Sequence, residues 1–189
     1  MTRKRVAVLI SGRGSNLQAL MDAQQDAYQV ALVVSNVPGV AGLDRAREAG
    51  VEAVALDHRP YGKNREAFER DLDALLVERN IEIVALAGFM RVLTPYFVNA
   101  WKGRLINIHP SLLPKYPGIN THARALEAGD AEHGCTVHLV VEEVDSGEIL
   151  GQARMPIGAN DTPETLAERV LTLEHELFPA CLAQLARSL

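Results

Sequence analysis

The residues best suited to chemistry lie together in the stretch RLINIHPSLLPKYPG, residues 104–118. Asn107 and His109 are two positions apart in an apolar run typical of a buried strand, and a strand sends such residues to the same face. Pro110 cannot donate to a sheet ladder and biases the preceding residue toward an extended backbone. We therefore expect His109 at the carboxyl end of this strand, where ligands bind in open α/β sheets.

An amide beside an imidazole suits reactions at a carbonyl carbon. The imidazole of His109 can accept or donate a proton near neutral pH, and the NH2 group of Asn107 is an uncharged donor for a developing oxyanion. The pair therefore indicates acyl-type transfer. A strand end whose Asn caps a turn and whose His is a satisfied, half-buried ring explains the same two residues, and a lone motif does not exclude it.

The segment SGRGSN, residues 11–16, places glycines and backbone N–H groups before a predicted helix, an arrangement that can hold a phosphate. It lacks the third glycine of GxGxxG, since Leu17 follows Asn16, and it has no GK[ST]. Dinucleotide and nucleoside triphosphate sites are therefore not expected. A phosphate monoester fits the pattern, and so does a tight turn without a ligand.

Two more segments have both a functional and a structural interpretation. Asp145 lies in the acidic, Gly-bearing segment EEVDSGE, which is either a solvated turn or the source of an acid that orients His109. The segment GFMRVL, residues 88–93, follows the fourth predicted strand and either lines a flat apolar pocket or packs into the core.

A zinc site is suggested by four potential ligands close together in the sequence, Glu132, His133, Cys135 and His138. The two histidines lack the helical spacing of HExxH, and residues 135–138 have the pattern of a strand, so we expect no metal. His58, His122 and His175 have no sequence partner that singles them out. Glu174, beside His175 in the last predicted helix, is by default a surface acid.

Composition favours one cytoplasmic domain over residues 1–189. A net charge of −5 gives no general attraction to nucleic acid or anionic membrane. The basic start resembles a signal peptide, but its apolar run is short and has no small-residue cleavage site, and no stretch approaches the ~20 apolar residues of a membrane span. Cys135 and Cys181 lie far apart and form no disulfide framework, so we expect both thiols to be inert.

Apolar and amphipathic segments alternate along the chain. Strands are predicted at residues 6–10, 30–35, 51–56, 83–87 and 105–109, with helices at 16–23, 44–49 and 65–79 between them. A helix at 121–128 and an antiparallel hairpin of residues 135–141 and 148–155 follow. The last helix starts after Thr162, and Pro179 should kink or break it. This order predicts an α/β fold: an open, mostly parallel twisted sheet with helices on both faces.

Taken together, several segments resemble the phosphoribosylglycinamide formyltransferase family of folate-dependent enzymes. They are SGRGSN, AGFMRVLTP, INIHPSLLPKYPG, HGCTVHLVVEEVDSGEIL and LEHELFP, in the family's order over nearly the whole chain. The resemblance implies a Rossmann-like formyltransferase fold. It also implies direct transfer of the formyl group of 10-formyltetrahydrofolate to the amine of glycinamide ribonucleotide, which gives formylglycinamide ribonucleotide and tetrahydrofolate in de novo purine (IMP) biosynthesis.

The resemblance implies roles for individual residues as well. The family's catalytic residues fall on Asn107, His109 and Asp145. Its ribonucleotide site falls on Gly14, Ser15, Asn16 and Glu174. Its folate site falls on Arg65, Met90, Arg91, Val92, Leu93 and Asn107, and no metal is implied. Backbone N–H groups for a phosphate, an apolar wall for the pterin and a cation for the glutamate tail are physically reasonable.

The sequence departs from the family pattern in two places. Arg13 stands between the glycines where a neutral residue is common, and the chain stops soon after Pro179.

Three rival functions fit the sequence less well. Methionyl-tRNA formyltransferase shares HPSLLPKY but continues with Arg-Gly-Ala-Ala-Pro, whereas PGINTH follows here, and that enzyme carries an additional domain for tRNA. Formyltetrahydrofolate hydrolase usually has an additional N-terminal regulatory domain. A non-catalytic nucleotide-binding module leaves the matching catalytic residues unexplained. The expected partners are the two small molecules, with no nucleic acid and no membrane, in a monomer or homodimer.

Overall fold

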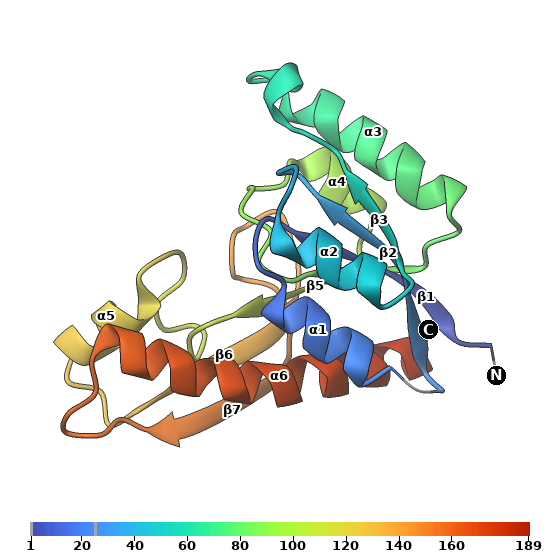
Figure 1. Ribbon diagram of the computed structural model, residues 1–189. Helices are drawn as coiled ribbons and strands as arrows, with labels where there is room; N and C mark the ends of the chain where they lie inside the picture. Colours follow the sequence, from blue (N-terminus) through green and yellow to red (C-terminus); the bar gives the residue numbers. More distant parts are fainter. Residues whose placement is uncertain (1, 25) are drawn as a thin grey trace.

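The computed structural model describes residues 2–24 and 26–189, which build one seven-stranded sheet (Figure 1). The strands are β1 (Lys4–Ile10), β2 (Tyr28–Ser35), β3 (Glu52–Ala55), β4 (Ile83–Leu86), β5 (Leu105–His109), β6 (Glu132–Leu139) and β7 (Ile149–Pro156). Their order is β3-β2-β1-β4-β5-β6-β7. Strands β1 to β5 pair in parallel, and β6 and β7 are antiparallel to their neighbours. The predicted α/β fold with its antiparallel hairpin is confirmed.

Helices cover both faces of this sheet. They are α1 (Ser15–Asp22), α2 (Ala41–Glu48), α3 (Arg65–Glu78), α4 (Pro95–Ala100), α5 (Thr121–Glu127) and α6 (Pro163–Ser188), with a 3-10 turn, η1 (Arg59–Tyr61). The sequence analysis did not predict α4 or η1. Both are short, and α4 presents only Phe97 and Val98 to the core, too few for a helical period to be visible.

Alternation along β1 shows how one strand serves two cores. Val6, Val8 and Ile10 belong to the apolar cluster under α1, α2 and α6, whereas Ala7 and Leu9 belong to the cluster under α3 and α4. Successive strand residues point to opposite faces, so a strand covered on both sides must be apolar throughout. The continuous apolar run at the start of the sequence has this cause.

Pro179 was expected to kink or break the last helix, and the break is wrong, because α6 continues from Pro163 to Ser188. A proline inside a helix costs about 3 kcal/mol through its missing N–H and its steric clash. Phe178 and Leu182 on either side are fully buried in the core. Burying two such side chains contributes roughly 1.5–3 kcal/mol each, enough to offset that cost.

The connections after β1 and β4 leave the sheet toward opposite faces. Strand β1 lies between β2 and β4, and it is followed by α1 on the side of α6, whereas α4, after β4, packs with α3 on the other side. Such a switch point is where open α/β sheets bind ligands, outside the carboxyl ends of the strands. A ligand site is therefore expected at the edge of the sheet formed by the residues that follow β1, β4 and β5. Within the described residues, no helix combines the length and apolar character needed to cross a membrane.

Candidate active site

Asn107 and His109 lie side by side on one face of β5. Strand β5 pairs antiparallel with β6, so that Asn107 is opposite His138 and His109 is opposite Thr136. Ile106 and Ile108, which alternate with Asn107 and His109 along β5, point into the core under α6. The period of the strand thus presents an amide and two imidazoles on the same face, at the end of the sheet where the parallel strands finish.

Asp145 reaches this group from the connection between β6 and β7. Its Oδ2 atom lies 3.5 Å from Nδ1 of His109 and accepts a hydrogen bond of 2.8 Å from the backbone N–H of Gly118. Its Oδ1 atom lies 3.7 Å from Nε2 of His138. Asp145 has a positive φ of 54°, a backbone conformation that costs energy for a residue with a side chain. The fold therefore holds the carboxylate against two imidazoles at the expense of local strain.

The ring of His109 faces an acceptor on each side. Nε2 lies 2.8 Å from the carbonyl oxygen of Tyr116, which can only accept, so Nε2 carries a proton. Nδ1 is then the ring nitrogen left for proton exchange, and it faces the Asp145 carboxylate. A neutral ring can donate to one of these acceptors, whereas an imidazolium can donate to both. Both ring nitrogens of His109 therefore face an oxygen acceptor.

His138 fixes the orientation of the Asn107 amide. Its Nδ1 atom lies 3.0 Å from the carbonyl oxygen of Leu139 and must donate to it, and its Nε2 atom lies 3.3 Å from Nδ2 of Asn107. Burial lowers the pKa of His138, partly opposed by that carbonyl and by Asp145, so the neutral form with Nε2 as acceptor is favoured. One N–H of the Asn107 amide donates to His138, which leaves the second N–H available to donate to a ligand.

His138 is a site residue that the sequence analysis missed, because it was weighed only as a zinc ligand. Thr136 and His138 repeat on β6 the two-residue spacing of Asn107 and His109 on β5, and this signal could have identified it. The zinc interpretation does not fit the geometry, since His133 and Cys135 point to the opposite face of β6 from His138. The described residues contain no group of three or more metal-ligating side chains.

The loop after His109 is tied down at several points. Hydrogen bonds of 2.6 Å run from Thr121 Oγ1 to the carbonyl of Pro110, from Ser111 Oγ to that of Lys115 and from Arg124 Nη1 to that of Pro117. The carbonyl of Tyr116 and the N–H of Gly118, which contact His109 and Asp145, both belong to this loop. Its order therefore determines the position of both side chains.

Two histidines behind this loop join α5 to β6. Nδ1 of His122 lies 3.0 Å from Nε2 of His133, with the rings at 89° to each other. One nitrogen must donate and the other accept, so the rings cannot both be charged. Burial lowers the pKa of both, that of His133 to about 4. Near neutral pH the pair is uncharged and holds α5 on the sheet.

The four residues expected at a ribonucleotide site come from α1 and α6, which pack together. Gly14, with φ of 76°, precedes Ser15 and Asn16 in the first turn of α1. The Nδ2 atom of Asn16 donates a 3.0 Å hydrogen bond to Oε2 of Glu174, whose pKa is raised by burial. The Oδ1 atom of Asn16 is buried without a partner among the described residues. Glu174 is thus a buried acid, not the surface acid that its position in a polar helix suggested.

Gly42 at the start of α2 is a second residue that sequence reasoning missed. Its N–H donates to the carbonyl of Gly12 at 3.1 Å. A Cβ at Gly42 would lie 2.8 Å from that carbonyl oxygen and would clash with Ile10. Likewise, a Cβ at Gly14 would lie 2.9 Å from the Cα of Gly42. The helix can therefore approach residues 12–14 this closely only with glycine at both positions.

The residues expected at a folate site lie on α3 and the segment after β4. Arg65 opens α3 and donates a 3.3 Å hydrogen bond to the carbonyl of Val92. Met90 and Val92 expose 74% and 58% of their surface, so they are free to contact a ligand. Arg91 instead lies over the ring of Phe68, and Leu93 packs against the core under α3 and α4. The four consecutive residues thus divide between solvent and protein.

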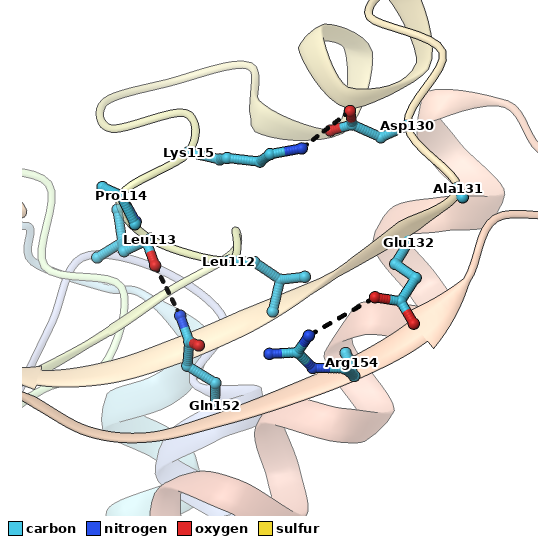
Figure 2. A pocket seen from close by; sticks show the side chains of 9 residues that line it. All are labelled: Leu112, Leu113, Pro114, Lys115, Asp130, Ala131, Glu132, Gln152 and Arg154. Atoms are coloured by element: carbon cyan, nitrogen blue, oxygen red, sulfur yellow. Dashed lines mark hydrogen bonds and ion pairs between the residues drawn. The ribbon is translucent and has the colours of Figure 1, made fainter.

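A cavity of about 530 Å³ lies beside the hairpin but includes none of these candidates. Figure 2 shows Leu112 between the two ion pairs of this cavity, which join Lys115 to Asp130 and Arg154 to Glu132. Its remaining lining residues are Leu113, Pro114, Ala131 and Gln152. Because its charges pair with each other, the cavity presents no converging reactive groups, unlike the end of β5.

Comparisons with known proteins agree on one family. The pattern of the family described as formyl transferase matches residues 4–182. The trifunctional purine biosynthetic protein adenosine-3 of Drosophila melanogaster is 52% identical over 188 residues, which are 97% of this chain but 14% of that protein. The chain therefore spans only a small part of this relative. The phosphoribosylglycinamide formyltransferase of Escherichia coli is 46% identical over 184 residues, 96% of this chain and 86% of that protein.

A solved structure matches over almost the full chain. The crystal structure of glycinamide ribonucleotide transformylase 1 from Symbiobacterium toebii has a TM-score of 0.95 and 40% sequence identity, and the match covers 99% of this chain and 89% of that one. The matched family region, residues 4–182, includes every candidate residue described above.

Proposed function

Because the chain belongs to the formyl transferase family, we propose that it transfers the formyl group of 10-formyltetrahydrofolate directly to the amine of glycinamide ribonucleotide. The products are formylglycinamide ribonucleotide and tetrahydrofolate, in de novo purine synthesis. One observation carries the proposal: Asn107, His109 and Asp145, on which the family's catalytic residues fall, meet at the carboxyl end of β5, with Asp145 Oδ2 3.5 Å from Nδ1 of His109.

In the proposed reaction the substrate amine attacks the formyl carbon of the folate. A C–N bond forms and the formyl oxygen becomes an oxyanion. The bond between the formyl carbon and N10 of the folate then breaks, the amine loses a proton and N10 gains one. Holding the two substrates together supplies much of the rate, because it converts a bimolecular step into a unimolecular one.

The side chains on β5 have complementary roles in this scheme. The free N–H of Asn107 and the charged ring of His109 stabilise the oxyanion. Asp145 stabilises the imidazolium through Nδ1, the nitrogen that the Tyr116 carbonyl leaves free, and it supports proton movement to N10. His138 acts through Asn107 by keeping one N–H of the amide turned toward the reacting oxygen.

Residues 14–16 and Glu174 would hold the ribonucleotide. The backbone N–H groups at the start of α1 suit its phosphate, because they have no partner within the helix and lie at the positive end of its dipole. Glu174 would accept from the glycinamide end, and Asn16 keeps its carboxylate in place. The buried Oδ1 atom of Asn16 is available to accept a hydrogen bond from the substrate.

The segment after β4 would hold the folate. Met90 and Val92 offer exposed apolar surface for the pterin, and backbone groups of residues 90–93 can bond its polar edge. Arg65 would pair with a carboxylate of the glutamate tail while it also bonds the carbonyl of Val92. Arg91 and Leu93 would support this wall from behind.

The proposal also covers the domain organisation, the co-substrate, the partners and the cellular location. Residues 1–189 form a single formyltransferase domain, supported by one sheet that runs from Lys4 to Pro156 under α6. The co-substrate is a 10-formyl folate, and the chemistry needs no metal. The partners are two small molecules, and monomer and homodimer are both compatible with the reaction. A cytoplasmic location is supported by the free, buried thiols of Cys135 and Cys181.

The test is the absorbance change as purified protein deformylates 10-formyltetrahydrofolate, with glycinamide ribonucleotide present and then absent. We expect turnover only with the ribonucleotide, and its loss in His109→Ala with both ligands still bound. Turnover without the ribonucleotide would indicate a hydrolase. Ligand binding without turnover in the wild-type protein would favour a non-catalytic binding module.

A further inference from the structure

We propose that Ser11 is a positioning residue that sets the folate-binding segment in register with the ribonucleotide-binding segment. The inference rests on the proposed function, which assigns residues 14–16 to the ribonucleotide and residues 90–93 to the folate. Ser11 begins the turn that leads from β1 to the first segment, and its side chain bonds the first residue of the second. It touches neither reacting group and acts through the backbone that holds them.

The hydroxyl of Ser11 links three neighbouring strands at their carboxyl ends. Its Oγ atom accepts a 2.9 Å hydrogen bond from the backbone N–H of Met90, which follows β4. The same hydroxyl donates a 2.5 Å hydrogen bond to Oδ1 of Asn36, which follows β2. Since Met90 can only donate here, the hydroxyl proton must go to Asn36. The bonds therefore run in one direction, from Met90 through Ser11 to Asn36.

Asn36 gives this link a rigid base. It is 3% exposed, and Nδ1 of His58, after β3, lies 2.9 Å from its backbone carbonyl oxygen and 3.2 Å from its Nδ2 atom. The backbone N–H of His58 also donates to the carbonyl of Asn36 at 3.3 Å. The side-chain amide is buried against the His58 ring, and its Oδ1 atom accepts from Ser11, so the acceptor for the Ser11 hydroxyl has a defined position.

The Ser11 link lies at the switch point of the sheet, just beyond the backbone bonds that join β1 to β4. Strands β1 and β4 are neighbours, but their connections go to opposite faces of the sheet. The last ladder pair between them joins Leu9 to Leu86, and one further backbone bond of 2.9 Å runs from the N–H of Ala87 to the carbonyl of Leu9, before either segment begins. Beyond it, the Ser11 hydroxyl spans the two diverging segments. Their relative position then decides how closely the formyl carbon approaches the amine, a distance on which the rate depends steeply.

Each segment also has anchors of its own, and these make the expected effect asymmetric. Residues 12–14 are held by the bond from the N–H of Gly42 to the carbonyl of Gly12 at 3.1 Å. The folate segment is held by the 3.3 Å bond from Arg65 to the carbonyl of Val92 and, at its far end, by the 2.7 Å bond from the N–H of Thr94 to Glu69. Met90 lies at the near end and depends on Ser11. Loss of the hydroxyl should therefore displace the folate side more than the ribonucleotide side.

The experiment measures kcat and both Michaelis constants for Ser11→Ala, with Ser35→Ala as the matched control. Ser35 also ends a strand and is fully buried, but its hydroxyl bonds only within the local turn at Val37. In Ser11→Ala we expect KM for 10-formyltetrahydrofolate to rise by up to about tenfold, the scale of one lost hydrogen bond. We expect KM for glycinamide ribonucleotide to change by less than about twofold. Ser35→Ala should leave the ratio of the two KM values as in the wild-type protein.

Two further variants separate positioning from a general loss of stability. Ser11→Thr keeps the hydroxyl and should restore KM for the folate. Ser11→Cys keeps the size of the side chain but bonds weakly, and it serves if the alanine variant does not fold. Amide hydrogen exchange at Met90 should accelerate in the alanine and cysteine variants while exchange at Val37 stays unchanged.

The outcomes distinguish this inference from the function on which it rests. No turnover by the wild-type protein would overturn the proposed function and this inference with it. Turnover by the wild-type protein with the same folate KM in Ser11→Ala, or an equal rise of both KM values, would overturn the role of Ser11 alone.

Discussion

Asp145 and His109 form a buried pair in which Oδ2 of the carboxylate lies 3.5 Å from Nδ1 of the ring, and the side chains are 9% and 6% exposed. They come from the connection after β6 and from the end of β5. Between two side chains buried this far, a charge on one acts on the other more strongly than it would in water. Nε2 of the ring is already engaged by Tyr116, so this contact selects Nδ1 for proton exchange.

Replacing Asp145 by Asn should lower kcat about 100-fold, the usual scale of a positioned acid–base group. The amide oxygen can still accept from the N–H of Gly118, so the loop should stay in place while the charge that stabilises the imidazolium is lost. Steady-state kinetics with both substrates would measure this. Glu143→Gln removes an exposed charge from the same connection and should leave kcat unchanged. Equal kcat in the Asn variant and the wild-type protein would contradict the role.

Replacing Glu174 by Gln should raise KM for glycinamide ribonucleotide about tenfold and leave that for the folate unchanged, since a charged acceptor becomes neutral. Burial raises the pKa of Glu174, so its carboxylate is lost as the pH falls through that raised value. The ribonucleotide KM of the wild-type protein should therefore rise toward acid pH, and that of the Gln variant should not. Glu176→Gln, on the exposed side of the same helix, is the control. Parallel pH profiles in Glu174→Gln and the wild-type protein would refute the assignment.

The pair of His122 and His133 predicts that stability falls in acid. The pKa of His133 is lowered from 6.5 to about 4, so in this window the unfolded chain binds a proton that the folded chain does not. The free energy of unfolding is therefore intact above about pH 6.5 and falls as the pH drops toward 4, by on the order of 3 kcal/mol from this group. Urea unfolding across this range would measure it. In His133→Gln the pH dependence should be shallower, and an unchanged slope would refute the prediction.

Replacing Gly42 by Ala should weaken both the fold and ribonucleotide binding. The added methyl group would lie 2.8 Å from the carbonyl oxygen of Gly12, which forces α2 away from residues 12–14. We expect a loss of about 1–3 kcal/mol in the free energy of unfolding, as for other overpacked sites, together with a higher KM for glycinamide ribonucleotide. Gly12→Ala meets no atom within 4 Å and is the control for stability. Equal stability of both variants would contradict this account.

Much of the fold could be predicted because its signals are local. Continuous apolar runs such as residues 6–10 identify strands covered on both faces, and the apolar spacing of residues 65–79 identifies an amphipathic helix. The short α4 and the unbroken α6 could not be predicted in this way. Their helical state depends on burial of Phe97 and Phe178 in separate cores, which local propensity does not report.

The sequence alone determined the strands, most of the helices and the placement of Asn107 and His109 on one face, because these follow from the period of the backbone over a few residues. It also carried the family resemblance, through motifs that are short and contiguous. Only the tertiary structure decided that Asp145 meets His109, that Asn16 meets Glu174, and that Ser11 bonds Met90. Each contact joins segments far apart in the chain, and its geometry depends on strand order, on register and on the close packing of helices that no local pattern encodes.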